Sequence, residues 1–174
     1  MKHRLFIASF IPKELSLKIM RRTEMFRHDD FKPVAIENPH ITFAFLGDRE
    51  EAEIPSIKQF LPRINEELAG MTFHFSGIEI FAQHGSKRPV VLALELSKEI
   101  TPFIENIKKE LCCDEAKPFI PHITIGKIRK EYANEAADSL KAIFMDLREE
   151  NHTMPQAVLA KSINTPERSF YTVI

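Results

Sequence analysis

The amino-acid sequence predicts an α+β fold built from two similar lobes that share a cleft. Apolar runs rich in Phe, Ile and Val alternate along the chain with charged stretches that are typical of helices. In addition, the motif Pro39-His40-Ile41-Thr42 recurs as Pro121-His122-Ile123-Thr124, about half a chain later. Both copies open an apolar strand, which favours a repeated structural unit. We therefore expect a single domain over residues 1–174 that consists of two lobes.

Composition and charge narrow the class of protein. The chain has 174 residues, of which 44% are hydrophobic and 28% charged, as in ordinary globular proteins. Its formal net charge of −1 argues against a polycation that holds duplex nucleic acid by charge alone. The basic and then apolar segment 1–10 runs into Pro12 without a small-residue cleavage site, so it predicts a strand rather than a signal peptide. We accordingly expect a cytoplasmic protein with no membrane partner.

The first part of the chain predicts two strands with a helix between them. A strand over residues 4–10 precedes Pro12, which suits the first turn of a helix that ends near residue 27. The turn 37–39 then leads into a strand over 40–46, which carries the first motif.

The rest of the chain predicts three helices and five strands. Residues 51–68 are helical in composition, although Pro55 and Pro62 limit the regular length of a helix there. The runs 71–81 and 90–96 are typical of the two strands of a hairpin. The sequence then predicts a helix from Ser97, as its N-terminal cap, to Cys112, a strand over 119–128, a helix over 131–149, and closing strands over 156–163 and 169–174.

Strand periodicity predicts which motif side chains reach the cleft. Because successive side chains point to opposite faces, His40, Thr42 and Ala44 share one face of their strand. Phe43 and Phe45 take the opposite face and are expected to pack into the core of a lobe. The second motif follows the same pattern, with His122, Thr124 and Gly126 toward the cleft.

Two imidazoles and two hydroxyls around one substrate suit phosphoryl transfer without a metal. Histidine titrates near pH 6.5, so one ring can accept a proton from an attacking hydroxyl or water while the other gives one to the leaving oxygen. The hydroxyls of Thr42 and Thr124 can donate to the non-bridging phosphate oxygens as charge builds. A metal site at His40 and His122 is the alternative, but it lacks a carboxylate or cysteine at ligand spacing. We therefore expect neither a metal nor a cofactor.

The motifs and their flanks resemble a known family. The tetrads His40-Ile41-Thr42-Phe43 and His122-Ile123-Thr124-Ile125 resemble the paired His-x-Thr-x motifs of the two-histidine (2H) phosphoesterases. Within that superfamily they are most similar to the LigT-like RNA 2',3'-cyclic phosphodiesterases, also called 2'-5' RNA ligases. The resemblance extends over nearly the whole chain, through the opening strand Arg4-Leu5-Phe6-Ile7-Ala8, the flank Pro118-Phe119-Ile120-Pro121, and Ser162 and Tyr171 in the closing strands.

The resemblance implies a bilobal fold of two pseudo-twofold-related lobes of mostly antiparallel sheet, with outer helices and a central cleft. It implies metal-independent hydrolysis of RNA 2',3'-cyclic phosphate ends to 2'-phosphate, and a related 2'-5' ligation in which a 5'-hydroxyl replaces water. His40 is expected to be the proton donor and His122 the proton acceptor, while Thr42 and Thr124 bind the phosphate. The partners implied are RNA or oligonucleotide ends that carry a 2',3'-cyclic phosphate.

One position departs from the family pattern. Five residues after the second histidine the family often has an arginine that helps to bind phosphate, and this chain has Lys127. Lysine keeps the charge but loses the planar guanidinium fork. Strict alternation also puts Lys127 on the face opposite His122, so it reaches the cleft only if the strand bulges near Gly126. The chain has no tryptophan, so any base stacking must use Phe or Tyr.

Two other functions remain open from the sequence. The enzyme could act on a small nucleotide cyclic phosphate or a 2'-5' oligonucleotide, because a near-neutral charge suits a short substrate at least as well as long RNA. Alternatively, the chain could be an RNA-binding module without catalysis. Two intact motifs argue against that reading, since binding alone has no chemical need for both imidazoles. We expect the chain to be a monomer.

Overall fold

Strands carry both His-Ile-Thr motifs in the computed structural model, which describes residues 1–82, 89–111, 113, 119–165 and 169–174. The large sheet contains eight strands, namely β1 (Lys2–Phe10), β2 (Lys32–Pro33), β3 (His40–Glu50), β5 (Phe75–Phe81), β6 (Val90–Leu96), β7 (His122–Ile128), β9 (Val158–Asn164) and β10 (Ser169–Val173). Their order is β10-β9-β1-β3-β7-β6-β5, with β2 paired to β7, and every pair is antiparallel. Together with the helices, this arrangement confirms the predicted α+β fold.

The two motif strands lie side by side at the centre of the large sheet. Ile41 of β3 pairs with Ile123 of β7. Strands β1, β9 and β10 extend the sheet beyond β3, and β6 and β5 extend it beyond β7, whereas β2 pairs with the same edge of β7 as β3 does. The large sheet therefore divides into a half that contains β3 and a half that contains β7, and these halves meet at the motifs.

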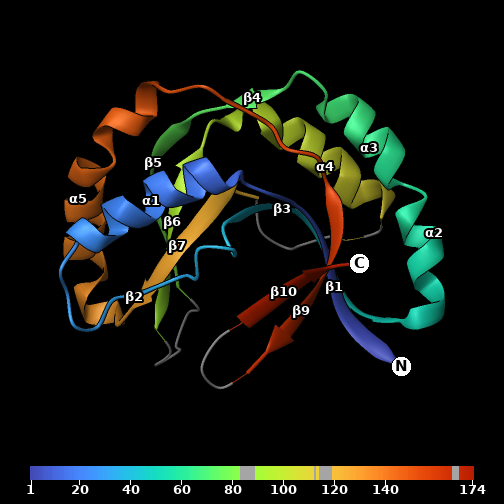
Figure 1. The fold of residues 1–174 in the computed structure, drawn as a ribbon, viewed down its shortest axis with the longest axis horizontal. Coiled ribbons are helices and arrows are strands. Elements are labelled where there is room, and N and C mark those ends of the chain that lie inside the picture. The colour runs from blue at the N-terminus through green and yellow to red at the C-terminus, as the bar shows by residue number, and fades with distance from the viewer. Residues whose placement is uncertain (83–88, 112, 114–118, 166–168) are drawn as a thin grey trace.

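Helices connect the two halves in a reciprocal way. Helix α1 (Lys13–Met25) follows β1 but contacts β7 in the other half, while α4 (Thr101–Glu110) follows β6 but contacts β3. Helix α5 (Ala133–Ile143) packs on β5 and β6 and touches α1. Figure 1 shows α1 and α5 at one side of the sheet. The helix that follows β1 thus packs on the half that contains β7, and the helix that follows β6 packs on the half that contains β3.

Prolines divide the helical stretch after the first motif. A 3-10 turn over Glu51–Glu53 leads into α2 (Ile54–Lys58), and α3 (Leu61–Leu68) follows. Each of these two helices has a proline in its first turn, where the missing N–H leaves no hydrogen bond unmade. The expected interruption of a helix over 51–68 is confirmed.

Ser97 does not cap a helix, contrary to the prediction. A 3-10 turn follows it, and α4 begins only at Thr101. The Ser97 hydroxyl instead accepts the backbone N–H of His74 at 3.4 Å, so it is not available to the helix. The predicted end of this helix at Cys112 lies outside the described residues.

The expected long strand over 71–81 is broken at His74. Its first residues form β4 (Thr72–Phe73), which pairs with β8 (His152–Thr153) in a separate small sheet. The carbonyl of His74 accepts the backbone N–H of Ser97 at 2.9 Å, which anchors the break. The predicted helix over 131–149 is likewise shorter, because α5 ends at Ile143 and a 3-10 segment follows.

The two faces of the large sheet have different roles. The main core lies on the face that the helices cover, and α1, α3, α4 and α5 all bury side chains there. On the opposite face, the buried side chains of Phe6, Ala8 and Ala160 form a smaller cluster with Phe10 and Tyr171 packed against it. This second face carries the motif histidines, so the fold leaves them open to a substrate.

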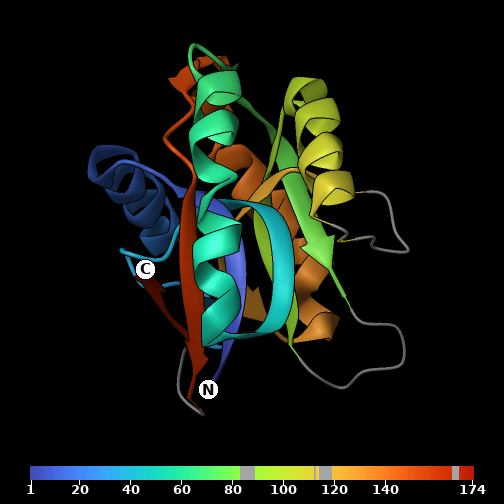
Figure 2. The ribbon, with the colours of Figure 1, turned by 90° about the vertical axis from the view of Figure 1, so that its right-hand side faces the viewer.

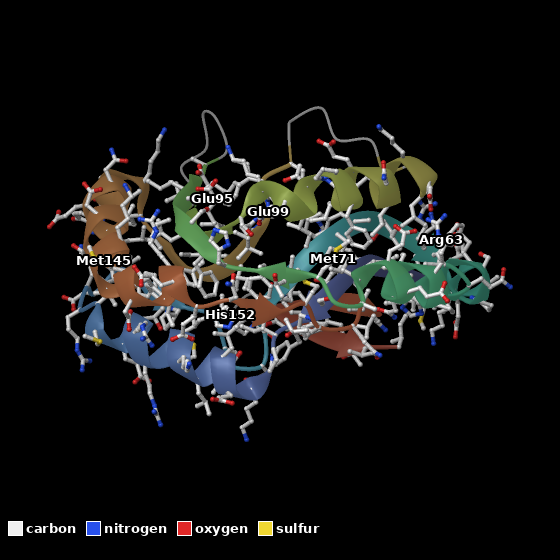
Figure 3. All side chains as sticks on the ribbon, turned by 90° about the horizontal axis from the view of Figure 1, so that it is seen from above. Arg63, Met71, Glu95, Glu99, Met145 and His152 are labelled. Carbon is white, nitrogen blue, oxygen red and sulfur yellow. The ribbon has the colours of Figure 1, made fainter. Side chains whose placement is uncertain are left out.

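The helices outside the sheet form two groups. In Figure 2, α2 and α3 form one column beside α4, and Arg63 of α3 makes an ion pair with Glu110 of α4. Figure 3 places Arg63 near one end of the molecule and Met145, which follows α5, near the other. Within the described residues, the helices are all too short or too polar to span a bilayer.

Candidate active site

Both motifs line a single pocket of about 270 Å³ on the open face of the sheet. His40 and Thr42 come from β3, and His122 and Thr124 come from β7. Thr42 is buried, whereas the other three side chains are partly exposed. Four of the five residues expected to act on the substrate are therefore brought together by the pairing of β3 with β7.

The two imidazoles are held by the same backbone contact. Nδ1 of His40 lies 2.6 Å from the carbonyl oxygen of Asn38, and Nδ1 of His122 lies 2.8 Å from that of Ile120. A carbonyl can only accept, so Nδ1–H of each ring donates. In the neutral ring, the contact fixes the tautomer that carries its proton on Nδ1 and its lone pair on Nε2.

A proline precedes each histidine and explains the matched geometry. The ring of Pro39 or Pro121 restricts the backbone between the histidine and the carbonyl that it contacts. The proline carbonyls accept backbone N–H groups: Ile11 N–H, directly after β1, donates to Pro39 at 3.2 Å, and Leu96 N–H of β6 donates to Pro121 at 2.9 Å. In both motifs, the proline therefore restricts the backbone next to the histidine and anchors it by a backbone hydrogen bond.

A β-bulge changes the direction of the side chains after the first motif. Opposite the consecutive residues Ile7 and Ala8, the register on β3 moves from Ala44 to Thr42, which leaves Phe43 as an extra residue. Ala44 is consequently buried in the core, and Phe45 turns to the pocket with 53% of its surface exposed. The predicted core position of Phe45 and cleft position of Ala44 are both wrong.

A second bulge occurs at the matching place in β7. The register on β7 skips Ile125, because Leu92 pairs with Gly126 while the next residue of β6, Ala93, pairs with Thr124. Gly126 therefore faces the core, where a Cβ atom would clash with the ring of Phe31, so its predicted place in the cleft is wrong. Lys127 turns to the same face as Thr124.

Lys127 nevertheless does not line the pocket. Its side chain is exposed, and it lies opposite Lys32 of β2. Strict alternation would place Lys127 on the face opposite His122, and the bulge returns it to the pocket face. Lys127 is nevertheless not among the residues that line the pocket. Its role in phosphate binding stays a prediction.

Aromatic rings surround both histidines. The centroid of the His40 ring lies 5.3 Å from that of Phe6, 5.4 Å from Phe10 and 4.9 Å from Tyr171. Burial lowers the pKa of His40 below 6.5, and the nearby charge of His122 lowers it further, although the Asn38 carbonyl favours the protonated ring. Burial thus favours the neutral form of His40 over the imidazolium.

His122 also packs against phenylalanines. Its ring centroid lies 4.4 Å from that of Phe81 and 6.4 Å from that of Phe119. Across the described residues, His, Cys, Asp and Glu side chains form no group of three that could hold a metal ion. The chemistry that the pocket itself offers is acid–base transfer by two imidazoles beside two hydroxyls.

Several pocket residues carry no role in the sequence analysis. Arg4 and Phe6 of β1 line the pocket, together with Ser162 of β9 and Tyr171 of β10. They lie within segments that resemble the family's opening and closing strands, but their place beside β3 depends on long-range strand order. For Arg4 and Phe6, the two-residue period of a strand already predicts that both side chains lie on one face of β1.

Comparison with known proteins places the chain in a family. Residues 10–91 match the family described as LigT like Phosphoesterase. An RNA 2',3'-cyclic phosphodiesterase of Aquifex aeolicus is 28% identical over 178 residues, which cover 97% of this chain and 87% of that protein. A protein of the same name from Thermus thermophilus is 30% identical over 135 residues, which cover 71% of this chain and 68% of that protein.

Solved structures agree in fold. The crystal structure of E. coli LigT in apo form has a TM-score of 0.66 and 20% sequence identity, and the match covers 99% of this chain and 95% of the LigT chain. The complex of E. coli LigT with 3'-AMP has a TM-score of 0.64 with 22% identity, covering 100% and 96%. On these sequence and fold similarities, the chain belongs to the LigT-like family of two-histidine phosphoesterases.

Proposed function

We propose that this chain hydrolyses the 2',3'-cyclic phosphate end of RNA to a 2'-phosphate without a metal ion. The observation that carries the proposal is the convergence of His40 and His122 on one pocket, each held through Nδ1 by a carbonyl two residues earlier. The names of the relatives support a cyclic phosphodiester as the substrate. The partner is accordingly an RNA or oligonucleotide end.

The two histidines divide the proton transfers of this reaction. Water attacks phosphorus, and Nε2 of His122 takes the proton that the water loses. The bond from phosphorus to the 3'-oxygen breaks, and Nε2 of His40 protonates that oxygen. The products are a 2'-phosphate and a 3'-hydroxyl, so one proton enters the enzyme and one leaves it. Thr42 and Thr124 donate hydrogen bonds to the non-bridging oxygens, where negative charge grows.

The lowered pKa of His40 bears on its role as donor. Burial disfavours the imidazolium of His40 and so makes the protonated ring a stronger acid. A bound cyclic phosphate carries a negative charge, which favours the protonated ring. Substrate binding therefore loads His40 with the proton that the leaving oxygen needs.

The same site would support 2'-5' ligation. In that reaction a 5'-hydroxyl replaces water as nucleophile, His122 takes its proton, and a 2'-5' phosphodiester forms in place of the 2'-phosphate. Lys127 is expected to assist by its charge on the same face of β7, beyond the pocket. Cytoplasmic location and a monomeric chain complete the proposal.

A small nucleotide cyclic phosphate is the second candidate substrate. A pocket of about 270 Å³ lies near the small end of typical ligand sites and suits one nucleotide rather than a long segment. This alternative uses the same histidines in the same roles, so it differs only in the length of the substrate.

The experiment that tests the proposal uses a short oligonucleotide with a 2',3'-cyclic phosphate end, in the presence of EDTA. We expect a 2'-phosphate product from the wild type, and none from His40→Ala or His122→Ala. His74→Ala serves as the control, because His74 lies outside the pocket, at the break between β4 and β5. A reaction that requires added metal, or one that survives both pocket substitutions, would refute the mechanism.

A further inference from the structure

Arg4 is a charged pocket residue that the proposed chemistry does not use. Of the described residues that line the pocket, it is the only one with a permanent charge. The following inference concerns this residue and rests on the proposed function. Its position within the pocket indicates which part of a substrate it meets.

The register of β1 against β3 places Arg4 away from the reacting group. On the pocket face, Phe10 lies opposite His40 and Ala8 lies opposite Thr42. Arg4 is four residues before Ala8, a separation of about 13 Å along an extended strand. The backbone of Arg4 therefore lies at the end of the pocket far from Thr42.

Aromatic rings occupy the stretch between Arg4 and the histidines. Phe6 lies on β1 between Arg4 and Ala8, and its ring centroid is 6.2 Å from that of Phe45. Both phenylalanines line the pocket. Apolar rings of this kind suit a sugar or base rather than a charged group. A nucleoside that covers them would have its cyclic phosphate at the histidines and its 5' end toward Arg4.

The guanidinium of Arg4 is available for an anion. Asp48 lies opposite Arg4 in the β1–β3 register, yet Arg4 makes no ion pair with any residue that the structure describes. Burial raises the pKa of Tyr171, and the positive charge of Arg4 acts in the opposite direction, so the guanidinium lies within electrostatic range of the Tyr171 hydroxyl. An unpaired guanidinium in a pocket is a preferred partner of phosphate oxygens.

We propose that Arg4 binds a second phosphate, the one attached to the 5'-oxygen of the terminal nucleoside. The pocket then recognises two anions, with the reacting cyclic phosphate between the histidines and a 5'-phosphate at Arg4. Substrates that carry this second phosphate include RNA ends and 5'-phosphorylated nucleotides. They are preferred over nucleoside 2',3'-cyclic phosphates that have a free 5'-hydroxyl.

The test compares two substrates that differ only in that phosphate. Adenosine 2',3'-cyclic phosphate is used with a 5'-hydroxyl and with a 5'-phosphate, and kcat/KM is measured for both. A charge-assisted contact predicts a preference of roughly 10-fold to 100-fold for the 5'-phosphate in the wild type. In Arg4→Gln we expect the ratio to fall to about 1, while Arg4→Lys keeps part of the preference because it retains the charge. Arg49→Gln, a matched loss of charge outside the pocket, should keep the wild-type ratio.

The outcomes distinguish this inference from the proposed function. Equal loss of kcat/KM on both substrates in Arg4→Gln would overturn the inference, because Arg4 would then act on the reacting phosphate or on the fold. If neither mononucleotide is hydrolysed by the wild type, the oligonucleotide assay decides the proposed function, and equilibrium binding decides the role of Arg4. In that case adenosine 2',5'-bisphosphate should bind the wild type more tightly than adenosine 2'-phosphate, and Arg4→Gln should lose the difference. Equal binding of the two nucleotides by the wild type would reject a second phosphate site.

Discussion

Replacing His40 with asparagine separates the chemistry of the ring from its structural contact. The side-chain amide of asparagine carries an N–H that can donate to the carbonyl of Asn38, as Nδ1–H of His40 does at 2.6 Å. It offers no counterpart of Nε2, the atom that we propose delivers the proton. Alanine, by contrast, would also leave the carbonyl without its partner.

The expected loss of activity is much larger than the loss of stability. Removal of a general acid lowers kcat by about 10²–10⁴-fold, or roughly 3–5 kcal/mol of transition-state stabilisation. The His40 ring also packs against Phe6, Phe10 and Tyr171, and its partial loss costs about 1–2 kcal/mol of folding free energy. In a domain of this size, that lowers Tm by only about 2–8 °C.

A sulfur-substituted substrate tests whether the missing proton is the cause. If sulfur replaces the 3'-oxygen of the cyclic phosphate, the leaving group is a thiolate, whose thiol has a pKa near 8.5 and which departs without protonation. We expect His40→Asn to recover most of its rate relative to the wild type on this substrate. His122→Asn should not recover, because its missing base is needed with either leaving atom.

Two results would refute this reasoning. If His40→Asn is equally impaired on the oxygen and sulfur substrates, His40 does not protonate the leaving group. If His122→Asn is the variant that recovers, the donor is His122 and the two roles are exchanged. Thermal unfolding of each variant accompanies the rates, so that a folding defect is seen as a large fall in Tm.

Three further predictions concern the pocket and its strands. The Cε1 proton of His40 should titrate in NMR with a midpoint below 6.5, since burial lowers its pKa, and inorganic phosphate should raise that midpoint; a midpoint above 6.5 in the free protein would contradict the effect of burial. Phe45→Ala should raise KM roughly 5-fold to 100-fold with little change in Tm, because an exposed ring in the pocket is lost; an unchanged KM would exclude contact with the substrate. Gly126→Ala should lower the free energy of unfolding by about 1–3 kcal/mol in chemical denaturation, because its Cβ would clash with Phe31, whereas an unaffected midpoint would show that the ring moves aside freely.

Local sequence patterns determine much of this fold. The alternation of apolar residues identifies the strands that carry the motifs, and the prolines at 55 and 62 mark where the following helices begin. The repeated motif also predicts that both imidazoles and both threonine hydroxyls meet around one cleft, and the structure places all four on one pocket. The strands and the helix starts depend on residues close together in the chain, so local pattern is enough to predict them. The meeting of the two motifs is instead predicted from their repetition, and it is achieved by the pairing of β3 with β7.

Only the tertiary structure decides which side chains continue the pocket beyond the motifs. The bulges at Phe43 and Ile125 arise from pairing with β1 and β6, and they reverse the faces of Phe45 and Lys127. Arg4 reaches the pocket because β1 pairs with β3, a choice of neighbour that no local pattern specifies. The physical reason is that the position of a bulge depends on how one strand hydrogen-bonds to a partner strand that is distant in sequence. The sequence by itself thus predicted the two imidazoles and two hydroxyls that line the pocket, and strand pairing decided what surrounds them.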